Sequence, residues 1–224
     1  SPDRAAAASL SGKVNYADGQ SGAIHVAASM QNANNRVLKL DGNGDFVRIP
    51  DLKNLAGSEL TIQYWFKGSS FQSAVRQQNA GWIVAGWNGM HILSNDGGTA
   101  GIQVGKANDG RWHHVLVTWK QGAPNGFASY LDGQPVDSRD ASDTPIGNQS
   151  SPVYFGSIVG VGEFSTGEMD EVAIWQRFMT PQEVAANWFR QLSGAEQGLV
   201  GYWNFDADRS EEHTSELQSH SDLV

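Results

Sequence analysis

The stretch GRWHHVLVTWK, residues 110–120, passes from a turn directly into a run of apolar residues. It is preceded by Asn-Asp, and Gly beside Asn or Asp is typical of tight turns. A second apolar run, Phe127–Leu131, follows the turn signal Ala-Pro-Asn-Gly. The stretch therefore predicts two strands, His113–Lys120 and Phe127–Leu131, joined by a turn.

The same alternation of short apolar runs and turn signals recurs along the chain. There are 26 glycines, and only 17% of residues are charged. Regularly spaced short strands of this kind suggest a β-sandwich or barrel. Eight further strands are predicted: Val37–Leu40, Phe46–Ile49, Leu60–Phe66, Gly81–Ala85, His91–Leu93, Gly101–Val104, Val153–Phe155 and Glu171–Trp175.

One segment breaks the strand pattern. Thr180 is a candidate N-cap, Pro181 occupies the first helical position and Glu183 completes a capping box. Val184, Trp188 and Leu192 then recur at helical spacing, which places Trp188 on the buried face. We expect a single helix over residues 181–192, ended by Ser-Gly.

Composition excludes several classes of function. The chain has 224 residues and a net charge of −9, which argues against nucleic-acid binding because phosphate contacts need clustered Lys and Arg. It has no cysteine, so disulfides and thiolate metal sites are excluded. No apolar run is long enough to cross a bilayer, so membrane insertion is not expected. The first residue is Ser1, as expected for a processed chain or an expression product.

Five segments occur in one order: LDGNGDFVRIP, ELTIQYWFK, GRWHHVLVTW, ASYLDGQPV and GEMDEVAIWQRFMTPQEV. Together they resemble the laminin-G-like, concanavalin A-like jelly-roll family over residues 38–192, most of the chain. The resemblance implies an all-β, antiparallel two-sheet jelly-roll sandwich with one short C-terminal helix. We expect a single domain over residues 1–208 with its core at 37–192, and edge strands from residues 15–30.

The motif DGNGDF, residues 41–46, places side-chain oxygens at Asp41, Asn43 and Asp45. These match the first three ligands of an EF-hand loop, but its Gly and Glu at positions six and twelve are missing, which excludes that site. A hairpin turn remains, since Asp-Gly and Asn-Gly form turns without metal. The family resemblance adds a structural calcium ion approached by Asp41 and Asp170, with Asn43 and Asp45 as further candidates. Otherwise Asp45 caps the turn and Asp170 accepts backbone hydrogen bonds.

The glucanase branch of this fold carries its carboxylates on one strand face, because retaining hydrolysis needs two carboxyl groups about 5 Å apart. Glu168 and Asp170 share a strand face here, while Glu171 points the other way. Val172 and Ala173 stand where a third carboxylate is required. We therefore expect no catalytic residues. A hydrolase or lyase that uses the concave face stays open as an alternative.

Aromatic residues supply the candidate ligand contacts. Sugar rings stack on Trp, while their hydroxyls need Asn, Asp or Gln partners. The segment AGWIVAGWNGMH, residues 80–91, predicts such a platform, with a polar loop before it that lines the rim. The candidate binding residues are Trp87, Asn88, Trp82, Gln77 and His91. The alternative is that Trp82 faces inward and only Trp87 is exposed.

The remaining aromatic residues predict framework roles. Trp65, Trp112, Trp119 and Trp175 lie in predicted strands or at their edges, so we expect them in the core. The adjacent His113 and His114 face opposite sides of a strand and do not share a metal. We expect one of them half-buried and hydrogen-bonded, and the other on the outer surface.

These observations favour a non-catalytic carbohydrate-binding or adhesion module, part of a larger secreted or cell-surface protein. Its expected partner is a glycan or a cell-surface ligand. A purely structural module, as in surface fibres, is the remaining alternative.

The C-terminal region carries two signals. Residues 198–206, GLVGYWNFD, resemble the segment that opens a further jelly-roll repeat or supplies the last strand of the present one. Residues 209–224, RSEEHTSELQSHSDLV, read like the translation of a DNA sequencing adapter. We expect this tail to be disordered or adventitiously helical, and the natural protein to be longer.

Overall fold

The computed structural model describes residues 36–49, 57–70, 73–77, 83–87, 90–95, 98–144, 152–158, 160–206 and 216–218. Within these ranges the chain forms fourteen strands and one helix, α2 (Pro181–Asn187). The strands make two sheets in which every neighbouring pair is antiparallel.

The two sheets are named here sheet I and sheet II. Sheet I has the order β1 (Leu38–Asp41), β12 (Thr166–Trp175), β3 (Glu59–Ser70), β8 (His113–Lys120), β9 (Phe127–Leu131) and β10 (Gln134–Arg139), with β13 (Leu199–Trp203) also paired to β12. Sheet II has the order β14 (Glu216–Gln218), β2 (Phe46–Ile49), β11 (Val153–Phe155), β4 (Val75–Gln77), β5 (Ile83–Trp87), β6 (Met90–Asn95) and β7 (Gly98–Gln103).

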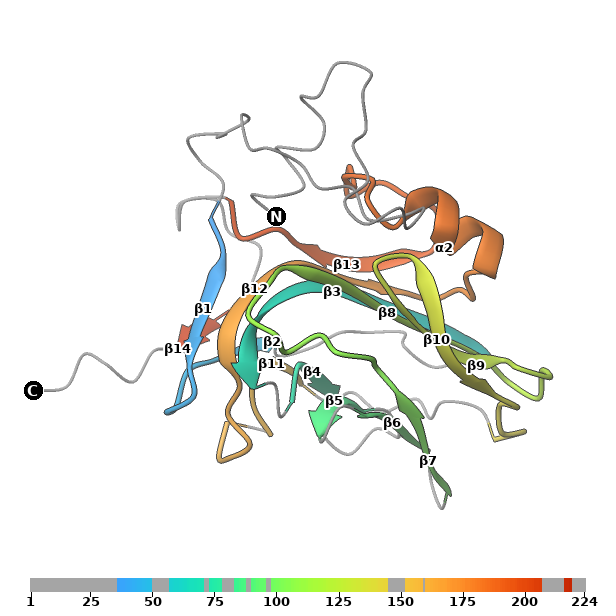
Figure 1. The fold of residues 1–224 in the computed structure, drawn as a ribbon, viewed down its shortest axis with the longest axis horizontal. Coiled ribbons are helices and arrows are strands. Elements are labelled where there is room, and N and C mark those ends of the chain that lie inside the picture. The colour runs from blue at the N-terminus through green and yellow to red at the C-terminus, as the bar shows by residue number, and fades with distance from the viewer. Residues whose placement is uncertain are drawn as a thin grey trace, which may run out of the picture.

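The sheets lie face to face as two layers, and α2 lies on the outer side of sheet I (Figure 1). This mostly β architecture, with two antiparallel sheets and one short helix, confirms the predicted jelly-roll class. All ten predicted strands are present, and the bounds of β2, β8, β9 and β11 agree with the prediction.

The core between the sheets follows from strand alternation. Ile62, Tyr64 and Phe66 on β3 point inward together with Val115 and Val117 on β8, and each is 5% exposed or less. Burying one large apolar side chain contributes about 1.5–3 kcal/mol, so these alternate positions specify which face of each strand points inward.

Part of the outer face of sheet I is buried as well. Its apolar cluster contains Leu116, Ala128, Tyr130, Ala173, Trp175, Met179 and Val184. Thr61 and Thr118 anchor the segment before α2 to this face. The Met179 N–H donates to Thr118 Oγ (3.0 Å), Thr118 Oγ–H to Thr61 Oγ (2.8 Å), and Thr61 Oγ–H to the Arg177 carbonyl (2.7 Å).

The predicted start of the helix is confirmed. Thr180 Oγ accepts from the Glu183 N–H, and Glu183 reaches back to the Thr180 N–H (2.8 Å), which is the capping box. The predicted end at residue 192 is wrong, because α2 stops at Asn187. The Asn187 side-chain amide donates to the Glu183 carbonyl (2.8 Å), so a side chain competes for a helical acceptor. Trp188 is the C-cap and partly buried.

Strands β4, β10 and β14 are absent from the prediction. Arg76 and Gln77 belong to β4 rather than to a polar loop, and Gln77 is only 2% exposed. The tail was expected to be disordered or helical, but Glu216–Gln218 pair with β2. The segment before Asp206 supplies strand β13 of this domain, one of its two predicted roles. The expected edge strands at residues 15–30 lie outside the described residues.

At one side of the sandwich, polar side chains join β10 to β7. The carboxylate of Asp137 on β10 accepts from the Gln103 N–H on β7 (2.9 Å), and Arg139 donates to the Gly101 carbonyl (3.3 Å). The Ser129 hydroxyl on β9 donates to the Gln103 carbonyl (2.5 Å). The last strands of the two sheets are therefore linked although they share no ladder.

Strands β3 and β12 approach closely where Gly68 faces Gly167. A Cβ atom at Gly68 would lie 2.8 Å from the Gly167 Cα and 2.7 Å from the Phe66 ring. Real side-chain atoms do not tolerate such distances, so glycine is required there for contact rather than for conformational freedom.

We expect Gly68→Ala to destabilise the protein by about 1–3 kcal/mol, the cost of overpacking a close contact. Urea unfolding measures the change. Gly162→Ala is the matched control, because its nearest neighbour, the Ile158 Cγ2, lies at an ordinary 3.4 Å. The control should change the free energy of unfolding by less than about 0.5 kcal/mol. Equal effects of the two substitutions would contradict the close approach.

Candidate functional site

The DGNGD segment is a turn closed by its own side chains. Asp41 Oδ1 accepts from the Asn43 N–H (2.6 Å), and Asp45 Oδ2 accepts from the Asp41 N–H (3.2 Å). Gly42 has φ +81°, a conformation that glycine adopts without strain. A Cβ at this position would also meet the Thr166 hydroxyl. The turn interpretation therefore accounts for both acidic residues and for Gly42.

The register of β1 against β12 separates Asp41 from Asp170. Asp41 pairs with Thr166, and Asp170 lies four residues further along β12. Four strand residues span about 13 Å, whereas calcium ligands lie within about 2.6 Å of the ion. The strand register therefore speaks against a calcium ion shared by Asp41 and Asp170, and the shared ion stays a prediction. The register follows from pairing between distant segments, which the sequence motifs did not contain.

The acidic and histidine side chains are dispersed over the described residues. Among them, no three His, Cys, Asp or Glu side chains are grouped so that they could hold a metal ion. Asp170 is 1% exposed, and burial raises the pKa of its carboxyl. Calcium at Asp41, Asn43 and Asp45 stays a hypothesis, and no function is derived from it.

The turn interpretation predicts how two substitutions of Asp41 change the stability of the protein. Asp41→Asn keeps a side-chain oxygen for the Asn43 N–H and should change stability little. Asp41→Ala removes that acceptor and should cost about 1 kcal/mol. Thermal unfolding of both variants, with EDTA and with added calcium, measures this. A calcium-dependent stabilisation of the wild type that Asp41→Asn loses would contradict the turn interpretation and restore a metal site.

An open depression lies where β1, β12 and β3 run side by side, and its volume is about 400 Å³. Gly167 and Gly68 line it, and Gly167 pairs with Leu40 on one side and with Gly68 on the other. Gly110 also lines it. We call this feature the glycine depression. Its polar lining comprises Lys39, Asp41, Asp45, Lys67, Ser69, Thr166 and Glu168.

Charges of both signs alternate across the rim of the glycine depression. Glu168 on β12 pairs with Lys39 on β1 and with Lys67 on β3. The Lys67 Nζ lies 3.4 Å from Glu168 Oε2, and both side chains are partly exposed. An exposed pair of this kind contributes little to stability, about 0–1 kcal/mol, so these groups are available to exchange partners.

Trp112 lies beside the glycine depression. Lys67 lines the depression, and its Nζ lies 5.9 Å from the centre of the Trp112 indole ring. Trp112 precedes β8 and is partly exposed, so the prediction that it belongs to the core is wrong. The same prediction is confirmed for Trp65, Trp119 and Trp175, which are 5% exposed or less.

His113 is held between two carboxylates. Its Nδ1 lies 2.8 Å from Asp132 Oδ2 and its Nε2 lies 3.1 Å from Asp109 Oδ1. The hydrogen bond to Asp132 raises the pKa of His113, against the opposing effect of burial. Arg111 in turn lowers the pKa of Asp109. His113 is therefore the half-buried, hydrogen-bonded histidine that was predicted.

The second histidine differs from its prediction. His114 points to the outer side of sheet I but is fully buried. The rings of Trp65 and Trp188 lie 5.4 Å and 6.1 Å from its imidazole. The partly buried C-cap of α2 therefore covers a position that was expected on the surface.

The raised pKa of His113 predicts a pH dependence of stability. The folded chain binds this proton more tightly than the unfolded chain, whose histidine pKa is about 6.5. The contribution is complete below that pH and is lost as the pH rises through the higher folded-state pKa. Urea unfolding should therefore show a larger deficit for His113→Gln at about pH 6 than at about pH 9, by on the order of 1 kcal/mol. A deficit independent of pH would contradict the charged pairing.

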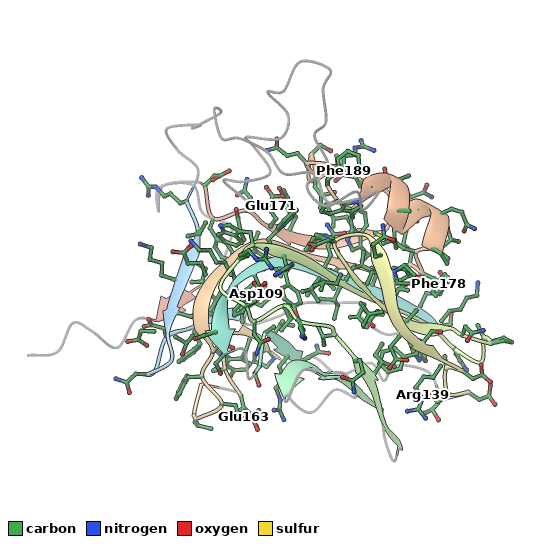
Figure 2. The ribbon with its side chains drawn as sticks, in the orientation of Figure 1. Asp109, Arg139, Glu163, Glu171, Phe178 and Phe189 are labelled. Carbon is green, nitrogen blue, oxygen red and sulfur yellow. The ribbon has the colours of Figure 1, made fainter. Side chains whose placement is uncertain are left out.

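The carboxylates of β12 do not form a hydrolase pair in an open cleft. The register of β12 against β3 shifts between Asp170 and Ala173, and Glu171 there has φ +54°. Side chains of β12 therefore do not alternate regularly between the two faces of the sheet at this point. Glu171 accepts from the Tyr202 hydroxyl (2.6 Å) and is 3% exposed. It lies on the side of sheet I that bears α2 and Phe189, away from Glu163 in the loop between β11 and β12 (Figure 2).

The predicted binding residues stay largely untested. Trp82 and Asn88 lie outside the described residues. Trp87 ends β5 and His91 lies in β6, and only their backbone is described. Gln77 is buried in β4, which is not the position expected for the rim of a ligand platform. The Trp87 platform therefore stays a prediction.

Two antiparallel sheets packed face to face, with one helix on the outside, define a lectin-like sandwich. A family model described as the concanavalin A-like lectin/glucanases superfamily matches residues 41–185. The chain belongs to this family, which confirms the resemblance seen in the sequence. Among the described residues, no helix is long and apolar enough to cross a bilayer.

Individual relatives agree with this assignment. Human neuronal pentraxin-1 is 31% identical over 66% of this chain, and the chain spans 41% of that protein. A Bacteroides ovatus protein described as carbohydrate-binding matches with a TM-score of 0.59 and 20% identity, over 78% of this chain and 54% of its own. A SAP-like pentraxin from Limulus polyphemus matches with a TM-score of 0.50 and 20% identity, over 68% and 81%. These structural matches show the fold alone.

Proposed function

We propose that this domain binds a glycan without catalysing a reaction on it, and that the glycine depression is the binding site. The observation that carries the proposal is an open hollow with a polar lining and a partly exposed tryptophan at its border. The family and the description of the Bacteroides ovatus protein make a glycan the favoured class of ligand.

The chemistry of the depression suits a sugar chain. The depression is open and is lined by three glycines, Gly68, Gly110 and Gly167, together with polar side chains. The hydroxyls and carboxylates of Thr166, Ser69, Asp41 and Asp45 can bond sugar hydroxyls, which both donate and accept. Binding exchanges their contacts with water for contacts with the sugar, and the open shape leaves room for a polymer to continue beyond the site.

Trp112 supplies the apolar part of the contact. The faces of sugar rings carry C–H groups that pack against an indole, as aromatic side chains do at many binding sites. The Lys67 ammonium beside the ring is a hydrogen-bond donor close to any sugar that lies there.

We infer that the whole protein works outside the cell, where glycans and other surface ligands are accessible.

A hydrolase is the less favoured alternative. Asp170 and Glu171 are buried, and Glu168 is paired with Lys67. A retaining mechanism requires two accessible carboxyl groups about 5 Å apart, which these residues do not offer.

A glycan array probed with the wild type and three variants tests the proposal. Trp112→Ala should weaken binding about tenfold, the loss expected for one aromatic contact, and Trp112→Phe should restore most of it. Trp87→Ala is the matched control on sheet II and should bind like the wild type. Loss of binding in Trp87→Ala alone would move the site to the hairpin predicted from the sequence. No binding of any glycan by the wild type would overturn the proposed function.

A further inference from the structure

The segment that leads into β8 contributes to the lining of the glycine depression. Gly110 lines the depression, and its N–H donates to the carbonyl of Gly68, a second lining residue, over 3.1 Å. Trp112 follows two residues later, beside Lys67. We call residues 109–112 the β8 lead. The position of the β8 lead therefore sets both a lining residue and the indole of the proposed glycan site.

The β8 lead bends around the carboxylate of Asp109, which lies between β7 and β8 (Figure 2). Asp109 Oδ1 accepts from the Arg111 N–H (2.9 Å) and lies 3.1 Å from His113 Nε2. Asp109 Oδ2 accepts from Arg111 Nε (2.9 Å) and Nη2 (2.7 Å). The bonds from Arg111 lower the pKa of the Asp109 carboxyl, so this carboxylate stays charged. The contact with His113 joins the bend to a strand of sheet I.

The other side of the His113 ring is fixed to the turn between β9 and β10. Its Nδ1 lies 2.8 Å from Asp132 Oδ2, and Asp132 Oδ1 accepts from the His114 N–H (2.9 Å). The Asp132 N–H donates to the His114 carbonyl (2.9 Å). Asp132 is thus bound to the backbone of β8, and the imidazole bridges from this fixed carboxylate to the carboxylate inside the bend.

Protonation decides whether His113 can hold both carboxylates. A neutral imidazole has one N–H donor and one acceptor nitrogen, whereas the charged ring donates from both nitrogens. When the ring is neutral, a proton on Nδ1 keeps the shorter bond to Asp132. The lone pair of Nε2 then faces Asp109 Oδ1, which is also an acceptor. Two acceptors at this distance repel each other, so the bend loses its contact with β8.

The surroundings of His113 favour its charged form. Charged side chains come from three adjoining segments: Asp132 in the turn after β9, Asp109 and Arg111 in the β8 lead, and Lys67 on β3, next to the register partner of His113. Lys67 has its own partner, Glu168. The hydrogen bond to Asp132 raises the pKa of His113 above the ordinary histidine value of about 6.5. The ring therefore loses its proton on the alkaline side of that value.

We propose that charged His113 holds the β8 lead in place through Asp109, and that glycan binding at the glycine depression therefore depends on pH. The inference rests on the proposed function, because it concerns the regulation of the same site. His113 is a positioning residue, since it contacts Asp109 rather than the ligand. Binding is strongest while the ring is charged and weakens as the pH rises. By linkage, a bound glycan also makes the ring hold its proton more tightly.

Trypsin cleavage of the free protein tests the His113–Asp109 contact without any glycan. Trypsin cuts after arginine, and cleavage after Arg111 requires the β8 lead to open, so the rate follows the open population. Arg190 is exposed after α2 and serves as the reference site. The pH dependence of trypsin itself cancels in the ratio of the two rates. In the wild type this ratio should rise about tenfold between about pH 6 and about pH 9.

Three variants show whether His113 sets this change. His113→Gln has no titrating ring and should give a ratio that does not depend on pH. Asp132→Asn removes the charge that favours the charged ring, so the midpoint of the rise should move to lower pH by about one unit. Asp140→Asn is the matched control, because Asp140 also accepts a backbone N–H, that of Asn125 (2.9 Å). The control should leave the midpoint unchanged. A merely structural role of the histidine would not move the midpoint in Asp132→Asn.

A glycan array read at two pH values tests the dependence of binding. Wild-type signals should be about tenfold stronger at about pH 6 than at about pH 9, within the range of coupling between sites in one protein. His113→Gln should give weak signals at both pH values, and Asp140→Asn should behave like the wild type.

The results that overturn the proposal differ from those that overturn the proposed function. A wild-type trypsin ratio that does not change with pH overturns the role of the His113–Asp109 contact, whether or not a glycan binds. An unchanged midpoint in Asp132→Asn overturns the assignment to His113. Equal array signals at both pH values overturn the effect on binding. No array signal at either pH overturns the proposed function, and the trypsin ratio then still decides whether His113 holds the β8 lead.

Discussion

A three-step hydrogen-bond chain fixes the layer arrangement on the outer side of sheet I. It runs from the Met179 N–H through the hydroxyls of Thr118 and Thr61 to the carbonyl of Arg177. Each hydroxyl accepts from one neighbour and donates to the next, an arrangement in which successive bonds strengthen one another. Both threonines are at most 1% exposed, so no water competes for them. The chain therefore determines where the polypeptide leaves β12 and where α2 begins.

This hydrogen-bond chain also influences how α2 packs against sheet I. It holds Val184 against the outer cluster and leaves Trp188 over His114, so the sheet is buried on both sides. A cavity lies between α2 and this face, and Gln63 is among the residues that line it. The glycine depression lies elsewhere on the same sheet, where β1, β12 and β3 run side by side.

The sequence predicted the features that depend on local pattern. Period-two alternation located β2, β8, β9 and β11, and the capping box located the start of α2. Features that depend on partners distant in the sequence were missed. The separation of Asp41 from Asp170 depends on the register of β1 on β12. The glycine depression is assembled from three strands and a loop, and no single motif contains it. Strand β10 was missed because it is largely exposed on both faces and mostly polar, so it lacks an alternating apolar pattern.

The contacts between β10 and β7 bear on how copies of this chain meet. A free strand edge invites another chain to add a strand, which is a route to aggregation. Asp137 and Arg139 occupy the Gln103 N–H and the Gly101 carbonyl, two backbone groups that an incoming strand would need. A neighbouring molecule must first displace a carboxylate and a guanidinium, and then leave both charges without those partners. This side of the sandwich therefore resists strand addition by a neighbouring copy of the chain.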